Sequence, residues 1–323
     1  EAAGTPCVAA HSPVRALYAA YNGPLYKVRR SDGMRQDIGV LAAGGFADSA
    51  TQDSFCMNLP CVISRIYDQS PQHNHLDIAP GGGFNRSHDQ GVNASRLKVA
   101  VGGHTVYGAH FEGGMGYRSD NTSGIATSDD SESMYMVTAG DHYNDECCFD
   151  YGNAETDNND DGAGAMEAIY WGTWNASRSG WSGGTGGGPW VMTDLENGLW
   201  AGNQIPYNPD NTPVTAKFVT AMLKGKAGGF ALKAANAQSG PLTTLYEGDR
   251  PSGYLTMKKQ GAIILGIGGD NGNRAVGSFF EGVMTRGYAS DTTDAAVQAN
   301  ILAAGYGRSK DMAAASQSNN FLI

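Results

Sequence analysis

The alternation of apolar and polar residues predicts a chain built mainly from β-strands. Short runs rich in β-branched and aromatic residues recur between Gly and Asn residues, a pattern typical of strands joined by tight turns. Most runs follow one another without an intervening amphipathic helix, which favours a sandwich of antiparallel sheets over a parallel α/β sheet. The predicted strands are residues 61–68, 96–101, 134–140, 166–171, 189–197, 215–224, 229–235, 262–269 and 278–285.

A period close to 3.6 residues appears in two places and predicts two short helices. Residues 12–22 begin with Ser12, a good N-cap residue followed by Pro, and stop before Gly23. Residues 291–304 place apolar side chains on one face and stop before Gly305.

Composition agrees with a single large β-domain and narrows the classes of function. The chain has 323 residues, of which 46 are Gly, about twice the usual share. The net charge is −10 and no basic stripe interrupts it, which argues against nucleic acid and anionic membranes as partners. No apolar run is long enough to span a bilayer.

The cysteines and glycosylation motifs indicate a secreted protein without a leader in this sequence. The five cysteines are Cys7, Cys56, Cys61, Cys147 and Cys148. Cys56 and Cys61 bracket a short loop and are predicted to form a disulfide, whereas an odd cysteine in a secreted chain needs a partner elsewhere. Free thiols in a cytosolic protein are the alternative. The four candidate glycosylation sites are Asn85, Asn93, Asn121 and Asn175.

The segment PWVMTDLEN contains the first pair of candidate catalytic groups. In a strand, Asp194 and Glu196 would share one open face while Val191 and Leu195 face a core. Their Cα atoms would lie about 7 Å apart. Two carboxyl groups can act as nucleophile and proton donor in glycoside hydrolysis. The alternative is a solvated strand face with two ordinary acids.

A second acid, Asp270, follows an apolar run in GAIILGIGGDNGN, although Asp-Asn-Gly is also common turn chemistry. Weaker candidates are a metal site at His73 and His75, and a calcium-binding or merely solvated loop at 157–162. Residues 66–76 and 278–297 resemble segments of laminin-G and concanavalin-like sandwiches, which include both lectins and glycosidases. Trp181, in a Gly-rich loop, could be a platform for a sugar.

Taken together, several long segments resemble one family. They are TPCVAAHS, IYDQS, HYNDECCFDYGNAET, MEAIY, GPWVMTDLEN, GAIILGIGGDN and FFEGVMT. The chain resembles the catalytic domain of the α-L-arabinofuranosidase B family, glycoside hydrolase family 54, to about residue 306. The resemblance implies a concanavalin-like, jelly-roll β-sandwich and a secreted, exo-acting, retaining arabinofuranosidase.

The resemblance also implies a role for particular residues. Glu196 would be the nucleophile and Asp270 the acid/base, with no metal and no cofactor in the reaction. A vicinal disulfide, Cys147–Cys148, would pack against the sugar. The remaining implied substrate-binding residues are Trp181, Asp194, Asn197 and Gly269.

The expected organisation is a catalytic domain over 1–306 and a tail or linker over 307–323. The arabinose-binding β-trefoil domain of the family is absent from the sequence, and the family's partner for Cys7 would lie upstream. Expected substrates are terminal arabinofuranosyl units of plant cell-wall arabinan, arabinoxylan and related oligosaccharides, and a monomer is expected. Two alternatives stay open: a non-catalytic arabinofuranose-binding lectin, and a glycosidase for another furanoside such as galactofuranose.

Overall fold

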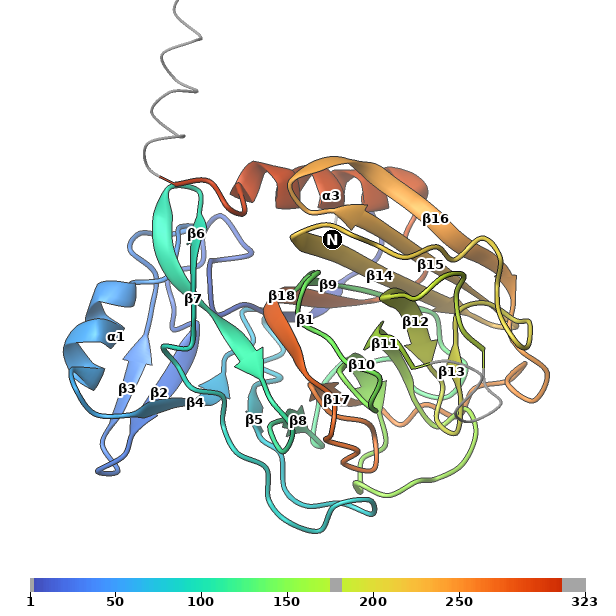
Figure 1. Ribbon diagram of the computed structural model, residues 1–323, viewed down its shortest axis with the longest axis horizontal. Coiled ribbons are helices and arrows are strands. Elements are labelled where there is room, and N and C mark those ends of the chain that lie inside the picture. The colour runs from blue at the N-terminus through green and yellow to red at the C-terminus, as the bar shows by residue number, and fades with distance from the viewer. Residues whose placement is uncertain (1–2, 175–181, 310–323) are drawn as a thin grey trace, which may run out of the picture.

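A computed structural model describes residues 3–174 and 182–309, and within these residues the strands form two antiparallel sheets (Figure 1). The predicted β-sandwich is therefore confirmed. The first sheet has the order β16 (Ser239–Asp249), β15 (Gly229–Asn236), β14 (Phe218–Lys226), β9 (Glu132–Ala139), β18 (Gly277–Arg286), β7 (His104–Phe111) and β6 (Leu97–Val101), with β1 (Cys7–His11) also paired to β18. The second has the order β13 (Leu199–Trp200), β12 (Trp190–Asp194), β11 (Glu167–Gly172), β10 (Asp150–Ala154), β17 (Ala262–Leu265), β8 (Tyr117–Ser119), β5 (Leu76–Ile78), β4 (Cys61–Ile66), β2 (Tyr26–Arg30) and β3 (Arg35–Ile38).

The core between the sheets is rich in aromatic side chains. The rings of Tyr151 and Phe279 lie 5.3 Å apart between centroids, and those of Phe111 and Phe149 lie 5.5 Å apart. All four side chains are fully buried. Because large apolar side chains gain the most from leaving water, this layer fixes how the two sheets face each other.

The outer face of the second sheet is also buried, and this face carries the candidate site. Successive side chains of a strand point to opposite faces, so Val191 joins the core between the sheets while Trp190 and Met192 point outward. The outward pair packs with Tyr170 and Cys148. Loops cover this layer, which becomes the floor of a pocket.

The prediction of a helix over residues 12–22 is wrong. The hydroxyl of Ser12 does accept hydrogen bonds from the N–H groups of Val14 and Arg15, as in a cap. The chain then makes a β-bridge between Arg15 and Phe46 instead of a helical turn. Arg15 instead pairs with buried Glu281 of β18, and this tertiary contact outweighs a weak helix propensity.

The helix predicted over residues 291–304 is confirmed as α3 (Asp291–Ala304), which lies alongside β14–β16 in Figure 1. Ser290 caps its start, and Gly305 ends it in the left-handed region at φ 74°. The short helix α1 (Ser49–Cys56) was not predicted, and a disulfide joins its last residue to Cys61. No helix within residues 3–174 and 182–309 is long and apolar enough to cross a bilayer.

The Arg15–Glu281 pair gives the first prediction. Glu281 accepts hydrogen bonds from Arg15 at 2.7 Å and from the hydroxyl groups of Tyr135 at 3.2 Å and Tyr306 at 2.6 Å. Glu281→Gln leaves a buried guanidinium without a counter-charge, and we expect it to lower the free energy of unfolding by about 3 kcal/mol in a denaturant titration. The matched change at exposed Glu112, Glu112→Gln, should cost less than about 0.5 kcal/mol. Equal effects of the two substitutions would contradict the assignment.

Candidate active site

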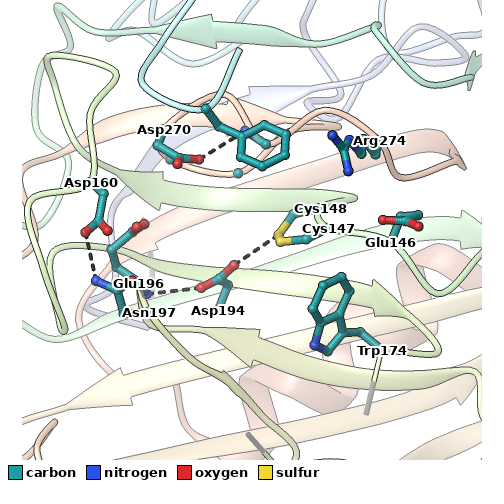
Figure 2. A pocket seen from close by; sticks show the side chains of 14 residues that line it. Glu146, Cys147, Cys148, Asp160, Trp174, Asp194, Glu196, Asn197, Asp270 and Arg274 are labelled. Carbon is teal, nitrogen blue, oxygen red and sulfur yellow. Dashed lines mark hydrogen bonds between the residues drawn. A yellow bond between two sulfur atoms is a disulfide. The ribbon is translucent and has the colours of Figure 1, made fainter. Parts of the chain in front are cut away.

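A pocket of about 240 Å³ opens on the outer face of the second sheet (Figure 2). Five acids contribute to its lining: Glu146, Asp160, Asp194, Glu196 and Asp270. The other side chains that line it include Phe84, Cys147, Cys148, Trp174, Asn197 and Arg274. The sequence-predicted acids Asp194, Glu196 and Asp270 are thus brought together, from segments about 75 residues apart in the chain.

Glu196 lies on a hairpin turn and not on a strand. Strand β12 ends at Asp194, and the N–H of Leu195 donates to the carbonyl of Gly198 at 3.1 Å. The two residues between them, Glu196 and Asn197, have φ values of +59° and +57°, the pattern of a type I′ turn. The predicted strand over 189–197 therefore extends three residues beyond the true end at Asp194, because left-handed residues cannot continue the pleat.

Neither Asp194 nor Glu196 stands on an open face, as the sequence pattern suggested. Their exposed fractions are 6% and 8%. Leu195, expected in the core between the sheets, packs instead against Trp200 and Tyr254 in a separate cluster.

Side chains around the turn hold its unusual backbone. The carboxylate of Asp194 accepts from the N–H of Glu196 at 3.0 Å. The hydroxyl of Tyr254 lies 3.1 Å from the carbonyl of Glu196 and 2.9 Å from that of Asn197. Asn197 donates to Asp160 at 2.8 Å. Left-handed residues other than Gly cost free energy, and these contacts offset that cost where the carboxyl group must be aimed.

Asp270 occupies a tight turn after β17, as the Gly-rich sequence indicates. Its carboxylate accepts from the N–H of Gly272 at 3.1 Å, and its carbonyl accepts from the N–H of Phe84 at 2.9 Å. Figure 2 shows Asp270 on the upper edge of the pocket, facing Glu196 and Asp194 on the lower edge. Burial is the main cause that raises the pKa of Asp270, and a raised pKa favours the protonated form of this carboxyl group.

A disulfide between the adjacent residues Cys147 and Cys148 forms part of the pocket floor. The sulfur of Cys148 lies 3.3 Å from a carboxylate oxygen of Asp194. Cys148 is buried against Tyr170, Trp190 and Met192. The floor therefore presents an apolar, sulfur-containing surface beside a hydrogen-bond acceptor.

Gly269 has a steric reason to be glycine. A Cβ atom at this position would overlap a carboxylate oxygen of Glu155 and lie 3.0 Å from one of Glu196. Trp181, the predicted platform, and the candidate glycosylation site Asn175 lie outside the described residues. A different tryptophan, half-buried Trp174, lines the pocket and packs against the 147–148 disulfide layer.

Two buried acids behind the pocket were missed by the sequence reasoning. Asp150 and Glu155 are both 0% exposed, and their carboxylate oxygens have no hydrogen-bond partner that meets normal geometry. Arg118 donates to the backbone carbonyls of Glu155 at 2.6 Å and Gly269 at 2.7 Å, which fixes Glu155 beside the turn that carries Asp270. Both acids stand in the segment HYNDECCFDYGNAET, but their spacing in the sequence does not distinguish them from other acids.

The carboxyl groups perturb one another strongly. Burial, followed by the charges of Asp194 and Glu155, raises the pKa of Glu196. Burial and the nearby Asp194 likewise raise the pKa of Asp150, and burial raises that of Glu155. So many buried groups cannot all be ionised together, and such neighbours share protons. The carboxyl groups of this cluster therefore share protons, and some of them are neutral at any moment.

The residues do not make a convincing metal site. Among the described residues, Cys147, Cys148 and Asp194 place one ligand atom each within 4.8 Å of one another. The sulfur atoms are joined in a disulfide and so cannot serve as thiolate ligands. The ring of His75 accepts a hydrogen bond from the N–H of Asp68, and neither it nor His73 lines the pocket.

The family of the chain can now be stated. The family described as "Alpha-L-arabinofuranosidase B, catalytic" matches residues 1–307. The chain belongs to this family. It is 54% identical over 310 residues to the alpha-L-arabinofuranosidase B of Aspergillus oryzae, covering 94% of this chain and 60% of that protein. The corresponding protein of Aspergillus kawachii is 51% identical over 313 residues, covering 95% of this chain and 62% of that protein.

Solved structures of the family agree with the fold. An arabinofuranosidase complexed with arabinofuranosyl-alpha-1,2-xylobiose superposes with a TM-score of 0.92 at 50% identity, covering 95% of this chain and 64% of that one. A glycoside hydrolase family 54 arabinofuranosidase soaked with a cyclic sulfate inhibitor gives 0.91 at 51% identity, covering 94% and 64%. The chain spans about 60% of the length of the curated relatives it matches.

The carboxyl cluster gives the second prediction. Glu155→Gln removes a carboxyl group that shares protons with Glu196 but keeps its shape and its ability to donate a hydrogen bond. We expect ionisation of Glu196 at lower pH, because a neighbouring charge that raises its pKa is gone, and therefore a weaker band of protonated carboxyl groups at neutral pH. Infrared difference spectroscopy over a pH titration measures both effects.

The matched control is Asp157→Asn, which removes an exposed acid from the same loop. It should leave the band of protonated carboxyl groups unchanged. An unchanged band in Glu155→Gln at every pH would show that Glu155 and Glu196 do not share protons.

Proposed function

We propose that this protein is an exo-acting, retaining α-L-arabinofuranosidase. The observation that carries the proposal is the placement of two buried or half-buried carboxyl groups, Glu196 and Asp270, at one small pocket. Membership of the arabinofuranosidase B family and a solved relative complexed with arabinofuranosyl-alpha-1,2-xylobiose support the choice of sugar.

In the first step Glu196 attacks the anomeric carbon of the bound sugar. Asp270 gives its proton to the glycosidic oxygen, so the bond to the leaving group breaks as the bond to Glu196 forms. Glu196 shares protons with the neighbouring Glu155, and it attacks in the state in which the proton lies on Glu155. The raised pKa of Asp270 contributes by favouring the protonated form that donates the proton.

In the second step the same groups release the sugar. Asp270, now ionised, takes a proton from water, and the oxygen of that water attacks the anomeric carbon and displaces Glu196. Two inversions at one carbon give overall retention. Asp194 and Asn197 are placed to bond the sugar hydroxyl groups, the backbone at Gly269 lies beside the acid, and the disulfide floor meets the apolar side of the ring.

The size of the pocket supports removal of single terminal units. A volume of about 240 Å³ is below the usual range for a drug-sized ligand, and the Cys147–Cys148 disulfide is part of its lining. A chain of sugars has no room to pass through such a site. A non-catalytic lectin would not need an acid with a raised pKa opposite a second carboxyl group, and we therefore favour the enzyme.

We further propose that the protein is secreted, acts as a monomer and takes arabinose-containing plant oligosaccharides and polysaccharides as substrates. Asn93 and Asn121 are exposed and accessible for glycosylation, whereas half-buried Asn85 donates to Asn273 at 3.3 Å. A disulfide between Cys56 and Cys61 suits an oxidising compartment. Cys7 is a free thiol, and burial raises its pKa to about 11.

The third prediction tests the nucleophile and the activity together. Glu196→Gln should lower kcat on an aryl α-L-arabinofuranoside by about a thousandfold or more, since the amide cannot attack the anomeric carbon. Glu112→Gln should keep the wild-type rate. Proton NMR of the first product should show α-arabinofuranose. A β-product would overturn retention, and an active Glu196→Gln variant would overturn the assignment.

The fourth prediction concerns pH. Glu196 must be ionised, so kcat/KM should fall as pH drops through the pKa of the carboxyl cluster. Asp270 must be protonated, so kcat/KM should also fall as pH rises through its raised pKa, giving a bell-shaped profile. In Asp270→Asn, measured on an aryl glycoside with a good leaving group, the high-pH limb should disappear. A persisting limb would assign the acid to another residue.

A further inference from the structure

The rim of the pocket beside Asp270 contains two side chains that the mechanism above does not use. Phe84 lines the pocket with an exposed fraction of 52%, unusual for a large apolar ring. The guanidinium of Arg274 lies over this ring, 5.1 Å from its centroid. Among the described residues that line the pocket, Arg274 is the one with a positive charge.

Backbone hydrogen bonds connect Phe84 to the turn of Asp270 and Arg274 to the pocket floor. The N–H of Phe84 donates to the carbonyl of Asp270 at 2.9 Å, and Asn271 donates to the carbonyl of Asn85 at 3.0 Å. The N–H of Arg274 donates to the carbonyl of Cys147 at 3.2 Å. These contacts fix the positions of Phe84 and Arg274 relative to Asp270 and to the pocket floor.

The position of the acid decides where the leaving group must lie. Asp270 delivers its proton to the glycosidic oxygen, so the first ring of the leaving group has to start next to Asp270. Figure 2 shows Asp270 and Arg274 along one side of the pocket, across from Asp194. A leaving group that departs on this side meets the exposed face of Phe84 and the N–H groups of Arg274.

We propose that Phe84 and Arg274 form the binding site for the leaving group, and that this group is a neutral sugar ring. The inference rests on the proposed function. The C–H face of the sugar would pack on the exposed part of the Phe84 ring, and the fixed fork of Arg274 would donate to its hydroxyl groups. The pair thus combines an apolar ring with hydrogen-bond donors stacked against it.

The charge of the rim favours a neutral sugar over an acidic one. Glu146 and Asp160 also line the pocket, and a uronic acid would meet these carboxylates as well as the single guanidinium. Arg274 is already engaged with the ring of Phe84, which orients the guanidinium without neutralising it. Phe84 and Arg274, at the rim of the pocket, would thus determine the specificity of the enzyme for the sugar that carries the arabinose.

The experiment compares two substrates that share the arabinofuranosyl unit. Methyl α-L-arabinofuranoside has a leaving group too small to cover Phe84, whereas arabinofuranosyl-xylobiose has a pyranose there. The readout is the ratio of kcat/KM for the oligosaccharide to kcat/KM for the methyl glycoside. Phe84→Ala should lower this ratio about tenfold, mainly through KM, because a binding contact and not a reacting group is lost.

Further variants separate the two contributions. Phe84→Tyr keeps the aromatic face and should retain most of the ratio. Arg274→Met keeps an apolar stem but removes the donors, and it should lower the ratio at least threefold. Tyr207→Ala removes a ring with a similar exposed fraction, 51%, that does not line the pocket, and should keep the wild-type ratio.

The possible outcomes distinguish the two proposals. A ratio unchanged in both Phe84→Ala and Arg274→Met, in an enzyme that cleaves both substrates, overturns the leaving-group site and leaves the arabinofuranosidase intact. A ratio lowered equally by Tyr207→Ala also overturns the site. A wild type that cleaves neither substrate overturns the proposed function, and the inference falls with it.

Discussion

The crowding of buried carboxyl groups is the constraint on which the rest of the site depends. Four buried acids lie on the outer side of one sheet, close enough to shift the pKa values of their neighbours. They are Asp150, Glu155, Asp194 and Glu196. Water cannot stabilise four charges there, so the cluster holds protons at neutral pH. The proposed mechanism needs one ionised nucleophile and one protonated acid, and it depends on this sharing of protons.

The architecture makes such a cluster possible by burying both faces of the second sheet. The inner face packs on the first sheet through aromatic rings, which leaves the outer face free to be covered by loops. Those loops carry the hairpin turn of Glu196, the Gly-rich turn of Asp270 and the rim at Phe84. A stable sandwich therefore supports a site whose own residues are placed at a local energetic cost, including two non-glycine residues at positive φ.

Much of the fold was predictable because its signals are local. The alternation of residues predicted strands such as β14 and β18, and the cap and glycine signals predicted α3. The pattern failed at residues 12–22, where a buried ion pair with Glu281 replaces the helix that the local residues favour. It also failed at 195–197, where two left-handed residues end a strand that the apolar alternation would continue.

The sequence by itself determined the β-sandwich, the family and the acids that are candidates for catalysis, because strand patterns and motifs depend on residues close together in the chain. Only the tertiary structure decided which acids share protons and which residues form the rim. Glu155 stands 41 residues from Glu196, and Phe84 stands 186 residues from Asp270. Their contacts arise because strands distant in the chain pair side by side, and the burial that perturbs a carboxyl group exists only after those strands have packed.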